Sequence, residues 1–230
     1  MIILASMIAV ASAVSVAGHY GPAHTGLIAE PVIAIGLVIA ARRLGISWRE
    51  LGLSRSTWAR GAIYALVAIA VVAIIYLAAA TIPITRDAFM DTRYRLPAGR
   101  ALLTALVIIP LGTILFEEVM FRGVLPAIVR KSKGVIAAVS VSSVLFGLWH
   151  VLPSLAMGAN MLVVRMVGEG MFATCIMVTA VVAFTGAAGW LLCEIRHRSG
   201  SIIATAGLHW ATNGLGVLLS SAIWSIRVAT

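Results

Sequence analysis

Long apolar runs alternate with short polar segments along the whole chain, and this pattern predicts a polytopic membrane protein. Each run approaches the roughly 20 residues that a helix needs to cross the hydrocarbon core of a bilayer. None shows the period-two alternation that marks a strand of a transmembrane barrel. We therefore expect an all-α transmembrane bundle of about seven to eight membrane helices. Seven apolar segments can be delimited, at residues 2–17, 25–41, 61–81, 101–129, 135–157, 170–193 and 201–225.

The polar segments between these runs are short and leave no room for a separate soluble domain. We predict a single membrane domain over residues 1–230, in which residues 1–99 form N-terminal helices and residues 100–217 form a core that carries the polar motifs described below. With the N-terminus in the cytoplasm, ten Lys and Arg residues fall on the cytoplasmic side, in segments 42–60, 130–134 and 194–200. Six Arg residues and three acidic residues fall on the other side. The positive-inside rule therefore predicts a cytoplasmic N-terminus.

Composition strengthens the membrane assignment and removes a rival one. Hydrophobic residues make up 61% of the chain, charged residues make up 11%, and the mean hydropathy is +1.07, which is outside the range of soluble domains. The formal net charge of +9 would suit a protein that binds nucleic acid. Because the basic residues lie in the short connecting segments, however, the positive-inside bias accounts for them. We expect the lipid bilayer as a partner and no nucleic acid.

Two further features concern processing and redox chemistry. The first apolar run, MIILASMIAVASAVSVAG, contains an Ala-Ser-Ala stretch but lacks the basic start of a signal peptide, so we favour a retained first helix over a cleaved one. Cys175 and Cys193 lie 18 positions apart in one apolar run, which is far beyond disulfide reach along a helix. We expect both cysteines to serve as small apolar side chains.

A few strongly polar residues lie inside the apolar runs, where a charge costs at least ~2.5 kcal/mol. Such residues should face the interior of the bundle, and each is a functional-site hypothesis. Glu30 is one of them, and we expect it near the outer interface, satisfied by a neighbouring helix. The others form three groupings on separate helices, each with members four positions apart on one helix face. These groupings are Glu117-Glu118-x-x-x-Arg122, Phe146-x-x-x-His150 and His209-x-x-x-Asn213.

The glutamate pair suggests a division of labour. Glu118 and Arg122 can form an ion pair across one helical turn, whereas Glu117 points about 100° away from Glu118 around the helix. Glu117 can then face a cavity and act as a general base. The alternative is that the three charges only neutralise one another and hold helices together. Pro110 and Gly112 precede the pair and are expected to kink its helix, which would either free a backbone carbonyl near the site or, as an equal alternative, serve packing alone.

The two histidine groupings add complementary groups. His209 and Asn213 both carry hydrogen-bond donors and could converge on an oxyanion, although an interhelical polar contact is an equal alternative. His150 alone is weaker support, because a single histidine near a helix end is more often a packed residue than a catalyst. Taken together, the three groupings supply a base, an electrophilic stabiliser and oxyanion donors, which is the set that a hydrolase needs.

In these residues the chain resembles the CPBP family of intramembrane proteases, also called the Abi family. That family includes the CAAX prenyl endopeptidases and bacterial relatives linked to bacteriocin processing and self-immunity. Its motifs EExxxR, FxxxH and HxxxN are complete and in order here, within a resemblance that spans roughly residues 100–217. The resemblance implies an active site buried between helices in a multi-pass protein, with the bacterial plasma membrane as the expected location. Residues 151–170 are longer than the family's usual connection, so the substrate class is not carried over.

The resemblance also implies roles for individual residues. Glu117 would activate water with help from His150, and His209 and Asn213 would hold the oxyanion. Glu118, Arg122 and Phe146 would support them. The expected substrate is a peptide or a membrane-associated protein, cleaved by an endopeptidase that needs no cofactor.

Three alternatives remain open. If the enzyme depends on a metal, zinc would be bound by Glu117, His150 and His209, although the chain has no His-Glu-x-x-His motif. A transporter or ion channel could use the same buried groups as a relay, but no inverted repeat is visible. A non-catalytic scaffold or immunity protein could keep the same fold.

Overall fold

The computed structural model describes residues 25–156 and 170–229, with positions 9, 10, 12–14, 16 and 168. Within these residues the chain is helical and has no strand, which confirms the predicted all-α membrane bundle. The α-helices are α2 (Thr25–Arg43), α3 (Trp58–Thr81), α4 (Pro83–Arg86), α5 (Ala98–Leu103), α6 (Leu115–Glu118), α7 (Leu125–Trp149), α8 (Val151–Ala156), α10 (Met171–Ser199) and α11 (Ile202–Ala229). Short 3-10 turns lie at Arg55–Thr57, Asp87–Phe89 and Thr92–Tyr94.

Four helical segments in the described part of the chain are long and apolar enough to cross a membrane. They are Arg55–Thr81, Ala98–Leu155, Met171–Ser199 and Ile202–Arg227. Three of them coincide with predicted apolar runs, and the second combines two such runs. The predicted run at 25–41 is the helix α2, which is not among the four. Most of the first predicted run lies outside the described residues, as do Arg165 and Glu169 of the charge count, so the expected number of membrane helices stays a prediction.

The longest of these segments reverses its direction within α7. Gly134 has a left-handed backbone with a φ of 82°, which separates two helical parts. The second part then runs antiparallel to the helix before it, so that Ser142 Oγ donates a hydrogen bond to the carbonyl of Phe121. The turn that the sequence predicts at 130–134 is confirmed. This hairpin brings the end of α7 back to the glutamate pair.

The helical segment that carries the glutamate pair is widened by π-helical turns, before the pair at Thr104–Ile108 and Pro110–Ile114 and after it at Val119–Val124. In the first of these the amide of Ile109 donates to the carbonyl of Thr104. Pro110 has no amide hydrogen, so the carbonyl of Ala105 loses the partner that a π-helix would provide. Trp210 Nε1 of α11 donates to this carbonyl at 2.8 Å. The carbonyl that Pro110 frees therefore ties α11 to this helix.

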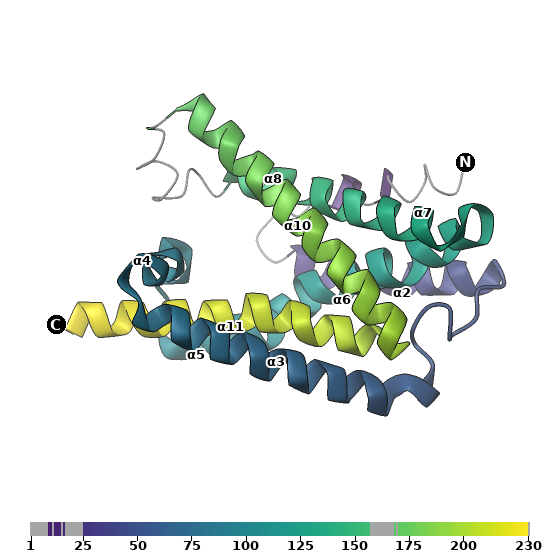
Figure 1. Cartoon of the computed structure of the whole chain (residues 1–230), viewed down its shortest axis with the longest axis horizontal. Coiled ribbons are helices and arrows are strands. Elements are labelled where there is room, and N and C mark those ends of the chain that lie inside the picture. The colour runs from purple at the N-terminus through teal and green to yellow at the C-terminus, as the bar shows by residue number, and fades with distance from the viewer. Residues whose placement is uncertain are drawn as a thin grey trace.

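Small residues allow the long helices to approach each other closely. α3 and α11 lie side by side and run in the same direction (Figure 1), and a Cβ on Gly207 would lie 2.3 Å from the Cβ of Ala65. α10 packs against the second part of α7, where a Cβ on Gly147 would lie 2.7 Å from the carbonyl oxygen of Val182. Larger side chains at either glycine would separate the helices. Close approach at small residues is typical of packing between membrane helices.

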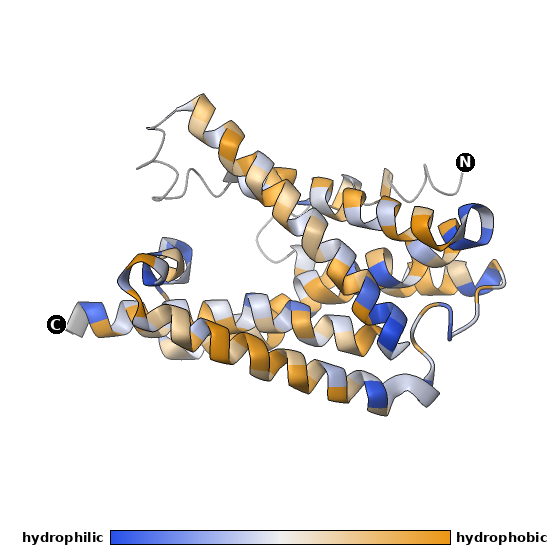
Figure 2. Ribbon diagram, in the orientation of Figure 1, coloured by the Kyte–Doolittle hydropathy of each residue, from blue (hydrophilic) through white to orange (hydrophobic). Residues whose placement is uncertain are grey.

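Large apolar side chains cover the outside of the bundle. α3 exposes Ile63, Leu66 and Ile74, and α10 exposes Phe172 and Phe184. Figure 2 shows apolar residues along the length of these helices, with the largest group of hydrophilic residues at the end of the bundle where α10 ends and further hydrophilic residues around α4 and near the C-terminus. A soluble protein rarely exposes so much contiguous apolar surface, so this surface faces lipid.

The three basic segments predicted to share one side of the membrane lie together at this hydrophilic end. Arg196 at the end of α10 donates to the carbonyl of Glu50 at 2.9 Å. The other end of the bundle holds the loop after α3, where Trp224 Nε1 donates to the carbonyl of Asp91 at 3.1 Å. The two sets of loops are thus segregated as the topology requires, while the choice of the cytoplasmic end stays a prediction.

Candidate active site

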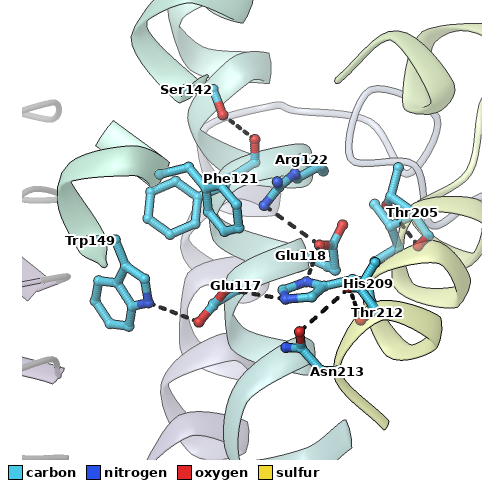
Figure 3. A network of polar contacts seen from close by, with 12 residues as sticks. Glu117, Glu118, Phe121, Arg122, Ser142, Trp149, Thr205, His209, Thr212 and Asn213 are labelled. Atoms are coloured by element: carbon cyan, nitrogen blue, oxygen red, sulfur yellow. Dashed lines mark hydrogen bonds and ion pairs between the residues drawn. The ribbon is translucent and has the colours of Figure 1, made fainter. Parts of the chain in front are cut away.

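His209 lies between the two glutamates of the first motif and contacts both (Figure 3). Its Nδ1 lies 2.9 Å from Oε1 of Glu118, and its Nε2 lies 3.7 Å from Oε2 of Glu117. All three side chains belong to residues that are at most 6% exposed. Packing of α6 against α11 therefore joins the first and third motifs, which are 91 positions apart, in one buried polar cluster.

Groups of opposite charge meet in this cluster. Arg122 Nη1 lies 3.5 Å from Oε1 of Glu118, as the spacing across one helical turn predicts. If both glutamates were ionised and His209 were neutral, one negative charge would remain uncompensated, which costs several kcal/mol in a buried site. The cluster thus places an imidazole beside a carboxylate, the two kinds of group that acid–base chemistry uses.

Trp149 orients Glu117, although our sequence analysis did not single it out. Its Nε1 donates to Oε1 of Glu117 at 2.8 Å, and its rings pack on Phe116 with centroids 5.4 Å apart. Oε2 of Glu117 has no hydrogen-bond partner among the described residues. One carboxylate oxygen is therefore fixed and the other is available. Trp149 reads as an apolar residue in a hydropathy pattern, and only its place beside His150 could have marked it.

Phe146 of the second motif connects the other groups. Its ring lies under the guanidinium of Arg122, with Cζ 3.8 Å from the ring centroid. The same ring packs edge to face against the rings of His150 and His209, with centroids 4.7 Å and 5.9 Å away. Phe146 is 3% exposed, so it shields the ion pair from solvent. All three motifs consequently meet around one aromatic side chain.

His150 and Asn213 lie farther from the carboxylates. Nδ1 of His150 lies 2.7 Å from the carbonyl oxygen of Phe146, which can only accept, so Nδ1 carries the hydrogen and Nε2 is left for chemistry. Oδ1 of Asn213 accepts from the hydroxyl of Thr212 at 3.4 Å. Neither side chain has a hydrogen bond to Glu117 among the contacts of the described residues. Of the predicted catalytic residues, Glu117 and His209 are in contact, whereas His150 and Asn213 do not bond to Glu117 in the described part of the chain.

Glu30 is a third buried carboxyl group near this cluster. It is 8% exposed and lies close enough to Glu117 for the two carboxyl groups to interact electrostatically. Its Oε2 has no hydrogen-bond partner in the described part of the chain, and the expectation that a neighbouring helix satisfies this residue stays a prediction. A Cβ on Gly26 would lie 3.2 Å from its Oε1, which shows how closely α2 confines the group.

Each residue of the alternative zinc site has one polar atom engaged by a neighbour and one that is not. Nδ1 of His209 is engaged by Glu118, Nδ1 of His150 by a backbone carbonyl, and one oxygen of Glu117 by an indole. Within residues 25–156 and 170–229, no three His, Cys, Asp or Glu side chains form a group that could hold a metal. Whether the reaction uses a metal stays open to direct test.

One protein family model matches the part of the chain that holds these motifs. The family model of the type II CAAX prenyl endopeptidase Rce1-like proteins matches residues 99–215, which is slightly more than half of the chain. The chain belongs to this family. The match contains all three motifs. The protein is thus an integral membrane member of a CAAX-type intramembrane protease family, as the resemblance implies. Comparison with curated proteins and with solved structures finds no match.

Proposed function

We propose that this Rce1-like protein is an intramembrane endopeptidase in which Glu117 activates water. The observation that carries the proposal is the position of its carboxylate. Oε1 accepts from Trp149, while Oε2 is unpartnered and lies 3.7 Å from Nε2 of His209. A separation of this size between two polar atoms suits a bridging water molecule. Water held there would contact both a base and an imidazole.

The reaction would proceed by addition and elimination. Oε2 of Glu117 takes a proton as the water oxygen attacks the carbonyl carbon of the substrate, and the carbonyl electron pair moves onto its oxygen. When His209 carries hydrogens on both ring nitrogens, its Nε2–H and the amide of Asn213 would stabilise this oxyanion. The proton then passes to the leaving nitrogen, with Nε2 of His150 as an auxiliary acceptor, and the C–N bond breaks. Glu118 and Arg122 would hold His209 in place.

The substrate would reach this site from the membrane. The cluster is buried among membrane helices, so a peptide with an apolar or lipidated segment fits better than a freely soluble one. The family description names prenylated CAAX ends. For this chain we propose the broader class of amphipathic or lipidated peptides and membrane protein ends. Residues 151–170, which begin with α8, would influence access.

The test is cleavage of a quenched fluorescent peptide library by the purified protein in detergent. Glu117→Gln keeps the size of the side chain and should lower kcat by roughly 100-fold or more, because it removes the base. His209→Ala and His150→Ala should also lose activity. Glu194→Gln, which removes a carboxylate on α10 outside the cluster, is the matched control. Wild-type cleavage by Glu117→Gln would sink the mechanism.

Three other measurements distinguish the alternative functions. Loss of cleavage with a chelator and its return with zinc would support a metalloprotease. Proton flux through liposomes without any cleavage would support a transporter instead. Peptide binding without cleavage, unchanged by Glu117→Gln, would support a scaffold.

A further inference from the structure

A basic cavity lies at the hydrophilic end of the bundle, apart from the glutamate pair. It has a volume of about 650 Å³ and lies between the start of α3, both parts of α7 and the end of α10. Seven Lys or Arg side chains line it, against the single carboxylate of Glu50. One wall is apolar and includes Val135 and Val139. This combination of a cationic lining with an apolar wall has no role in the proposed peptidase reaction.

Arg122 reaches this cavity from the buried cluster. The residue is 1% exposed, and none of its Nε, Nη1 and Nη2 atoms has a hydrogen-bond partner among the described residues. Its ion pair with Glu118, at 3.5 Å, compensates the charge but leaves these donors unused. A buried guanidinium with unused donors is costly, and an anion that accepts from it would remove that cost.

Arg196 provides a second, rigidly held guanidinium. Its Nη2 donates to the carbonyls of Arg49 and Glu50, at 3.1 and 2.9 Å, while its Nε is buried without a partner. The loop is shaped around this side chain, because a Cβ on Gly52 would lie 2.2 Å from Nε. Preorganised arginines of this kind match the tetrahedral oxygens of a phosphate group.

We propose that this cavity binds the phosphate group of an anionic membrane lipid. The basic lining would take the headgroup and the apolar wall the adjoining acyl chains, in the way that basic pockets between membrane helices bind acidic lipids. Free phosphate shares the chemistry but would leave the apolar wall unused. The cavity is at the end of the bundle that the positive-inside rule predicts to be cytoplasmic. Because Arg122 also faces Glu118, a bound phosphate would be coupled to the glutamate pair.

The test is lipid-dependent thermal unfolding of the full chain, which does not depend on peptidase activity. The protein is placed in nanodiscs of phosphatidylcholine alone or of phosphatidylcholine with phosphatidylglycerol, and separately in detergent with inorganic phosphate. Phosphatidylglycerol should raise the unfolding midpoint of the wild type. In the cavity variant Arg60→Gln/Arg130→Gln, affinity for the lipid should fall roughly tenfold or more, since charge-assisted contacts are lost.

The matched control is Arg43→Gln/Lys133→Gln. It removes the same charge from exposed positions at the same end of the molecule, outside the cavity lining. A second variant, Val135→Glu, places an anion at the exposed rim of the cavity and should abolish the lipid effect without removing a basic residue. Each variant must first show the unfolding midpoint of the wild type in phosphatidylcholine alone.

The outcomes are distinct. If phosphatidylglycerol no longer stabilises the two cavity variants but still stabilises the control, the result supports the site. Equal loss in the cavity variant and the control would mean general attraction to an acidic surface and would overturn the proposal, as would an absence of any phosphatidylglycerol effect on the wild type. Stabilisation by inorganic phosphate to the same extent as by lipid would overturn the assignment to lipid and leave free phosphate as the ligand.

Discussion

Nδ1 of His209 and Oε1 of Glu118 lie 2.9 Å apart, and the same oxygen faces Arg122 at 3.5 Å. A single carboxylate oxygen thus orients the histidine and pairs with the arginine. Since a carboxylate can only accept, this contact places a hydrogen on Nδ1 of His209 and directs Nε2 toward Glu117. The two glutamates consequently differ in role, because Glu118 sets the tautomer and Glu117 faces the other nitrogen.

Removing one partner of the ion pair between Glu118 and Arg122 should destabilise the protein more than removing both. Arg122→Met leaves a buried carboxylate without its guanidinium and is expected to lower the free energy of unfolding by about 3–5 kcal/mol. Glu118→Leu/Arg122→Met removes both charges and should recover most of this loss. Unfolding of the single and double variants in detergent measures the coupling. Strictly additive losses would contradict a paired role.

Trp149 should act on catalysis through Glu117. Trp149→Phe keeps a ring against Phe116 but removes the Nε1–H donor, so the orientation of the carboxylate is lost. We expect kcat to fall by roughly tenfold, with KM nearly unchanged, since one hydrogen bond to a charged group is lost. Trp190→Phe, at a position 50% exposed on α10, is the control. A raised KM with unchanged kcat would instead identify Trp149 as a substrate contact.

Two glycines with the same backbone conformation should respond differently to substitution. Gly45 and Gly52 both have a φ of 75°, so alanine strains each backbone by about 1 kcal/mol. At Gly45 a Cβ would meet nothing within 4 Å, whereas at Gly52 it would collide with Arg196. Gly52→Ala should therefore lower the unfolding midpoint clearly more than Gly45→Ala. Equal effects would show that the loop does not depend on the packing of Arg196.

The loop before α3 should also give the protein an acid-sensitive contribution to stability. Hydrogen bonds from the hydroxyl and the amide of Ser47 lower the pKa of Glu50 below its ordinary value of 4.5. A lowered pKa in the folded state means that the contribution is complete above about 4.5 and is lost as the pH falls through the lower, folded value. Ser47→Ala should therefore lower the unfolding midpoint at neutral pH and flatten its decline in acid. Thermal scans across this range measure both effects, with Ser56→Ala as the control.

The sequence by itself determined the class of the protein and its polar groupings. Apolar runs of membrane-spanning length predict helices because backbone groups in lipid must bond within their own segment. The ion pair of Glu118 with Arg122 follows from the same local geometry, because residues four positions apart share a helix face. Even the turn at Gly134 and the freed carbonyl before the glutamates have local causes, a glycine and a proline.

Only the tertiary structure decided which of these groups meet. The contact of His209 with both glutamates depends on how α11 packs against α6, and the hydrogen bond from Trp149 depends on where the hairpin returns. The burial of Glu30 near Glu117 likewise depends on how the helices pack. Such contacts are fixed by the fit of small and large side chains between helices, which no periodicity along one helix encodes. The basic cavity has the same origin, since loops far apart in the chain assemble it.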